Sequence, residues 1–203
     1  MANIINVSMQ MLLGNEMAKV YYSSNLLTSF QDFSSDYMNK YNSARMFLNS
    51  ERENAMQKAL SFETFENGNG FLSSMSNESL EQLAVTIVGA YYSSGYRSSF
   101  NEFVSDFLYN YSLTKQMLRT EIRKEEQLRN SFEGFENSCD AVRLLNNEGM
   151  DHLSIQIVNT YYSTHRLGDF KGFAEEYINN YKLSSNVVKN NNEEISENAK
   201  KFH

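Results

Sequence analysis

The feature that most constrains this chain is a pair of adjacent tyrosines that occurs three times at a fixed spacing. The segments are Tyr21-Tyr22-Ser23-Ser24, Tyr91-Tyr92-Ser93-Ser94 and Tyr161-Tyr162-Ser163-Thr164. Each segment lies 70 residues after the one before it. Any fold for this chain must therefore accommodate one short aromatic motif three times.

Other aromatic residues follow the same register, without insertion or deletion. The matching sets are Phe30, Phe100 and Phe170; Phe33, Phe103 and Phe173; Tyr37, Phe107 and Tyr177; and Tyr41, Tyr111 and Tyr181. Shared positions hold 11 of the 13 tyrosines and 12 of the 14 phenylalanines, which is too regular for chance. The sequence predicts three tandem repeats of about 70 residues, at 1–70, 71–140 and 141–203, within one compact domain.

The composition and the apolar spacing both indicate helices. The 203 residues include no proline, and proline clashes with a helix interior and removes a backbone donor. Apolar residues at spacings of three and four predict a helix from about Glu78 to Ser94. A second helix is predicted from the spacing of Phe100, Phe103 and Phe107. We expect an all-α fold with two to three helices in each repeat.

The length of the second helix is left open by two competing patterns. Its apolar stripe extends through Ala55 and Phe62, which favours one continuous helix of more than 30 residues. A residue type that caps helices stands at the same position in each repeat: Ser50, Thr120 and Asn190. Ser50 with Glu53 also has the spacing of a capping box. We expect a long helix that bends or breaks at this position.

Polar stretches between the apolar ones predict turns and a loose end. The segment Asn146-Asn147-Glu148-Gly149 is typical of a turn that closes the helical pattern. The tail from about Asn190 is polar, and we expect it to fray. Packed together, the three repeats would form a short solenoid or a pseudo-threefold bundle.

The two tyrosines of each pair have different expected roles. Neighbouring residues on a helix point about 100° apart, so both rings cannot serve one contact. We assign the first tyrosine of each pair to the core of its own repeat. The second, Tyr22, Tyr92 or Tyr162, is a candidate for contacts between repeats or with a partner protein. Asn15 and Ala18 replace branched residues near Tyr22, which is typical of an end repeat.

An acidic residue recurs beside the aromatic stripe. Its three copies are Asp36, Asp106 and Glu176. The plain interpretation is a charge at the flank of a helix, where it can meet a tyrosine hydroxyl of a neighbouring repeat.

No residue pattern indicates chemistry on a substrate. The three histidines (His152, His165 and His203) do not recur at the period of 70, and none has the spacing of a metal ligand set. No glycine-rich pattern fits a phosphate. We therefore predict no catalytic residue, metal or cofactor. The net charge of −7 carries no basic cluster, so we expect no nucleic-acid partner.

Cysteine usage and hydropathy bear on the compartment. Cys139 is the only cysteine, so an intrachain disulfide cannot form and a reducing compartment is favoured. The N-terminus lacks a signal-peptide pattern, and no window reaches the roughly 18 apolar residues of a membrane span. We expect a soluble cytoplasmic protein with no membrane partner.

These observations favour a function in binding. The leading hypothesis is a non-enzymatic adaptor, inhibitor or regulator of another protein, since stacked repeats expose extended surfaces. The alternative is a structural component that assembles into homo-oligomers. A carrier of an apolar small molecule is less favoured.

Overall fold

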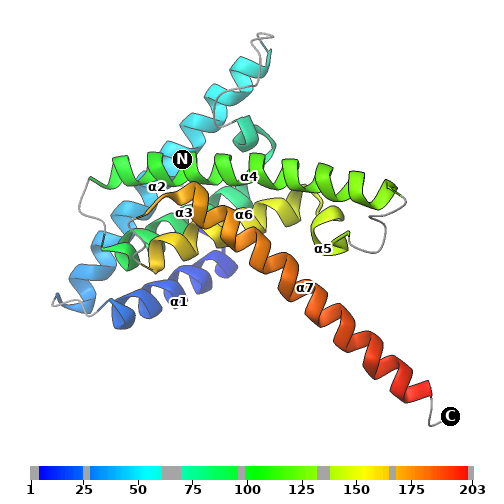
Figure 1. Ribbon diagram of the computed structural model, residues 1–203. Helices are drawn as coiled ribbons and strands as arrows, with labels where there is room; N and C mark the ends of the chain where they lie inside the picture. The colour runs from blue at the N-terminus through cyan, green and yellow to red at the C-terminus, as the bar shows by residue number, and fades with distance from the viewer. Residues whose placement is uncertain are drawn as a thin grey trace. The chain divides into compact units, whose positions relative to one another are not determined.

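The computed structural model describes residues 5–24, 28–60, 70–95, 99–131, 138–164 and 168–200 (Figure 1). These residues form seven α-helices and one short 3-10 helix, and no strand occurs in those ranges. The prediction of an all-α chain is confirmed.

The helices begin at the period of the sequence. In chain order they are α1 (Val7–Ser23), α2 (Phe30–Leu60), η1 (Gly70–Ser74), α3 (Asn77–Ser94), α4 (Phe100–Asn130), α5 (Asp140–Arg143), α6 (Asn147–Ser163) and α7 (Phe170–Lys200). The first residues of α1, α3 and α6 lie 70 residues apart, as do those of α2, α4 and α7. The helix predicted from about Glu78 is α3, which begins one residue earlier.

Side chains close the open ends of the shorter helices. The first backbone N–H groups of a helix have no partner within it, and a preceding Ser or Asn can accept from one of them. Three caps do so: Asn6 accepts from Met9 at 2.8 Å, Ser76 from Ser79 at 3.0 Å and Asn146 from Gly149 at 2.7 Å. The prediction of a turn at 146–149 is therefore wrong, because Asn146 caps α6 and the following residues belong to the helix.

The three long helices are unbroken at the position where a break was expected. Each of α2, α4 and α7 has 31 residues and passes Ser50, Thr120 or Asn190 without interruption. The Thr120 hydroxyl donates to the Gln116 carbonyl at 3.0 Å, as mid-helix threonines do. In α2, buried Leu48 and Ala55 lie on both sides of Ser50, so core packing continues along the helix. The backbone of α7 is helical through Lys200.

The chain packs as two compact units, each described by itself. The first comprises Met1–Ser112 with Val158–Leu167, and the second comprises Leu113–Ile157 with Gly168–His203. This division follows contacts in space, whereas the predicted boundaries at 70/71 and 140/141 follow the sequence register. Those boundaries, and the arrangement of the repeats, stay predictions.

In the first compact unit, α3 packs against α1 and α2, and η1 packs against α2. The aromatic stripes of α2 and α4 supply its largest buried side chains: Tyr37, Tyr41, Phe103, Phe107 and Tyr111. Each of these side chains has 0% exposure, so the stripe is core, as its spacing predicts.

In the second compact unit, α5 packs against α7. Its buried apolar residues include Leu118, Val142, Leu153, Ile157 and Ala174. Cys139 is buried there as a free thiol.

Candidate interaction site

Tyr92 joins α3 to α2 within the first compact unit. Its ring stacks on Tyr37 with centroids 5.7 Å apart and an interplanar angle of 9°, and it meets Phe33 at 5.1 Å. Its hydroxyl donates a hydrogen bond to the Asp36 carboxylate. A tyrosine of the second predicted repeat thus lies against the long helix of the first.

Charge surrounds this contact. Lys40 Nζ forms an ion pair with Asp36 at 2.6 Å and lies 5.4 Å from the centre of the Tyr92 ring. Burial alone would raise the pKa of Asp36, but hydrogen bonds from Lys40 and Tyr92 outweigh it and hold that pKa below its usual value. Burial, together with the hydrogen bond to Asp36, raises the pKa of Tyr92. At neutral pH a neutral donor therefore faces a charged acceptor.

Tyr162 forms the same kind of contact one period later. Its ring stacks on Phe107 with centroids 5.9 Å apart at 15°, and it meets Phe103 at 4.8 Å. Its hydroxyl accepts a hydrogen bond from Asn110 at 2.9 Å, and the side chain is buried. Asn110 occupies the position of Lys40 in the register, so the polar partner changes while the aromatic contact is kept.

Tyr22, the third candidate, faces solvent. The side chain is 80% exposed, and its ring meets the adjacent Tyr21 edge-on at 5.5 Å. The three candidate residues therefore divide into two that are covered by α2 or α4 and one that is open.

Tyr21 and Tyr91, the first tyrosines of the first two pairs, pack on aromatic residues of the long helix that follows each, although they are half-buried. Tyr21 meets Phe30 at 5.2 Å and Phe33 at 5.3 Å. Tyr91 makes the matching contacts with Phe100 and Phe103 at 5.1 and 5.3 Å. They line the edge of the aromatic core.

The α7 helix exposes apolar positions that are buried on the other long helices. Val188 is 60% exposed, whereas Leu48 of α2 and Leu118 of α4, at the same register position, are completely buried. Tyr181 is half-buried, whereas its counterparts on α2 and α4 are completely buried. The periodicity of the sequence cannot distinguish these positions, because the three helices share it.

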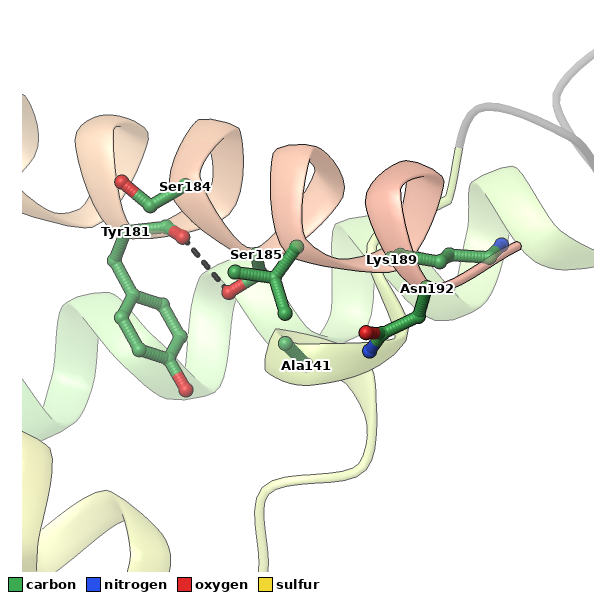
Figure 2. Close-up of a pocket in the computed structure, with 7 residues that line it drawn as sticks. Ala141, Tyr181, Ser184, Ser185, Lys189 and Asn192 are labelled. Carbon is green, nitrogen blue, oxygen red and sulfur yellow. Dashed lines mark hydrogen bonds between the residues drawn. The ribbon is translucent and has the colours of Figure 1, made fainter. Parts of the chain in front are cut away.

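A pocket lies beside this part of α7 (Figure 2). It is open to solvent, has a volume of about 660 Å³ and is lined by Ala141, Tyr181, Ser184, Ser185, Val188, Lys189 and Asn192. In Figure 2 the Tyr181 and Asn192 side chains lie on either side of Ala141.

One substitution in the repeat register explains this hollow. Ala141 occupies the position of Phe71, whose ring lies 4.5 Å from Tyr111. The third copy lacks that ring, which leaves space beside Tyr181. An alignment of the three repeats shows that Ala141 replaces an aromatic residue. The spacing of residues within one helix does not reveal this.

Buried charges in the second compact unit are paired. Lys182 Nζ contacts Glu121 at 2.6 Å and also Glu125, and Glu125 accepts from the Cys139 backbone N–H at 2.7 Å. Burial opposes the charge on Lys182, but the two carboxylates outweigh it and raise its pKa. Lys115 is likewise paired with Asp151. These groups connect helices to one another, which is a structural role.

The described residues contain no cluster of three or more histidine, cysteine or acidic side chains that could hold a metal ion. His152 is exposed on α6, whereas His165 and His203 lie outside the described residues. Among the helices that the structure describes, none is long and apolar enough to cross a membrane. No known family model, curated protein or solved structure matches this chain.

Proposed function

We propose that this chain is a non-enzymatic protein of three tandem helical repeats that acts by binding another protein, as an adaptor, inhibitor or regulator. The recurring aromatic register and the helix starts at the same period support the repeats, arranged as a short solenoid. Such arrays present side chains from successive helices on one extended surface.

The single observation that carries this proposal is the exposure of Tyr22. Two tyrosines of the same motif, Tyr92 and Tyr162, stack on aromatic pairs of the preceding long helix. Tyr22 has the same motif on the same kind of helix, and 80% of its side chain is open to solvent. Tyrosine suits interfaces because it combines a rigid apolar ring with a polar tip.

The ionisable groups support a binding role over catalysis. The carboxylates with lowered pKa values, Asp36, Glu121 and Asp140, are each held by a lysine or arginine side chain and, at Asp36, also by a tyrosine hydroxyl. A catalytic acid or base needs a pKa near the working pH, and these shifts move the pKa values away from it.

We place the protein in the cytoplasm, where the lone buried thiol of Cys139 stays reduced.

An affinity capture from the native host tests the proposal. The wild-type chain, Tyr22→Ala and Tyr109→Ala would each be immobilised as bait. Tyr109 is 68% exposed on α4 and serves as the matched control. We expect wild type and Tyr109→Ala to retain a protein other than this chain, and Tyr22→Ala to lose it. Identical capture by all three baits, or capture by none, would count against the proposal.

A further inference from the structure

The two internal tyrosine contacts share one geometry. In each, a tyrosine from a shorter helix lies over two aromatic residues four positions apart on a long helix. The receiving pairs are Phe33 with Tyr37, whose centroids lie 5.8 Å apart, and Phe103 with Phe107, at 6.1 Å.

The α7 helix carries the same receiving pair. Phe173 and Tyr177 have centroids 6.0 Å apart, which matches the spacing of the other two pairs. Tyr177 is half-buried, whereas Tyr37 and Phe107 are completely buried. The third long helix therefore carries the same aromatic pair, and Tyr177 of this pair is more exposed than its counterparts on α2 and α4.

The exposed region extends further along α7. On α2 the corresponding region is covered by the start of the following repeat, since η1 packs on α2 and Arg52 donates to Asn77 at 2.7 Å. Leu48 in this region is completely buried. On α7, Val188 stands in the register position of Leu48 and is 60% exposed.

We propose that a second copy of this chain covers this face of α7, with its Tyr22 ring on Phe173 and Tyr177. The contact repeats between copies the one that Tyr92 and Tyr162 make within a copy. Glu176 stands where Asp36 receives the Tyr92 hydroxyl, so it supplies a matching acceptor for Tyr22. This inference rests on the Tyr22 face of the proposed function and adds a second copy of this chain as a further partner of that face.

Continuity with the internal contacts argues for a second copy over an unrelated partner. The ring that docks, the pair that receives it and the acid beside them are all copies of groups that already bind each other in this chain. The two surfaces differ from one another, so the contact is heterologous. Each copy keeps one surface free after docking, which leads to closed rings or open filaments.

A mixing experiment with opposite-end variants of the full chain tests this arrangement. Tyr22→Glu places a charge on the docking ring, and Val188→Glu places one on the receiving face at an exposed position that should not disturb folding. Sedimentation velocity should show concentration-dependent association for wild type and loss of association for each variant alone. An equimolar mixture of the two variants should form a heterodimer, because each supplies the surface that the other lacks.

Two exposed residues provide matched controls. Asn186 lies about 180° around α7 from Tyr177, so Asn186→Glu should associate like wild type. Tyr109→Glu should do the same. The proposal is overturned if wild type stays monomeric up to its solubility limit, if either end variant still associates alone, or if their mixture stays monomeric. If wild type stays monomeric but still captures another protein through Tyr22, the proposed function stands and only the self-association is overturned.

Discussion

At the scale of single residues, the contact around Tyr92 combines ring stacking with a hydrogen bond to a charged acceptor. We expect Tyr92→Phe to keep the stacking and lose the bond to Asp36. Hydrogen bonds to charged groups contribute about 1.5–3 kcal/mol, and solvent around Asp36 reduces this, so we expect a loss of about 1 kcal/mol in the free energy of unfolding.

Chemical denaturation of Tyr92→Phe beside Tyr22→Phe measures this difference. The Tyr22 side chain is exposed, so its substitution should stay within about 0.5 kcal/mol of wild type. Equal stabilities of the two variants would contradict a role for the Tyr92 hydroxyl.

The aromatic stripe makes a larger contribution at Phe103. This side chain is completely buried and packs on Tyr91, Phe107 and Tyr162. Phe103→Ala should lower the free energy of unfolding by about 3–5 kcal/mol, since it removes apolar burial and leaves a cavity. Tyr109→Ala on the same helix is the exposed control. A loss below about 1 kcal/mol for Phe103→Ala, on the scale of a surface substitution, would remove the stripe from the core.

Buried tyrosines also predict how stability depends on alkaline pH. Burial raises the pKa values of Tyr37, Tyr41 and Tyr92 in the folded chain. A raised pKa contributes stability that is complete below the unfolded-state pKa of about 10 and is lost as pH rises toward the folded-state values. We expect urea denaturation midpoints to fall steeply above about pH 10. The midpoint of Tyr92→Phe should fall less steeply with pH, because this variant lacks one titrating group. An equally steep fall in wild type and in the variant would contradict this prediction.

At the scale of elements, the long helices are where two local signals competed. Ser50 and Glu53 have the spacing of a capping box, yet α2 continues through both. A cap needs an extended backbone at its own position. Leu48 and Ala55 are buried on either side of Ser50, and a break would have removed one of them from the core.

Proline at position 51 tests this continuity. Proline is tolerated at the first position of a helix, so Glu51→Pro would be mild if a new helix began after Ser50. Within an unbroken helix it removes a hydrogen bond and clashes with the preceding turn, at a cost of about 3 kcal/mol. We expect the larger loss in thermal or chemical unfolding. Glu51→Ala is the control, and a proline variant as stable as it would indicate a helix boundary there.

At the scale of the whole molecule, self-association through native surfaces predicts a melting temperature that depends on protein concentration. A partner that binds only the folded state stabilises it by mass action. Calorimetry of wild type should show a rising melting temperature as the concentration increases. Tyr22→Glu should show a constant one, because its docking ring carries a charge. A constant value for wild type would speak against association of folded copies.

Much of the local structure was predictable from sequence. Helix α3 was predicted to within one residue because the apolar spacing along a helix is a local signal. The turn expected at 146–149 was wrong because the same polar residues that form turns also cap helices. The assignment of Tyr92 and Tyr162 to contacts between repeats or with a partner stays a prediction, and the pocket beside α7 was missed.

The sequence alone determined the period of 70, the helical class and the positions of the aromatic stripes, because helix geometry converts residue spacing directly into faces. Only the tertiary structure decided which copies of a shared position are covered. Tyr22, Tyr92 and Tyr162 have the same local pattern, and so do Leu48 and Val188, yet their exposures differ widely. Burial depends on whether another segment lies against a face, and the residues of that face indicate this only indirectly, as Asn15 and Ala18 do near Tyr22.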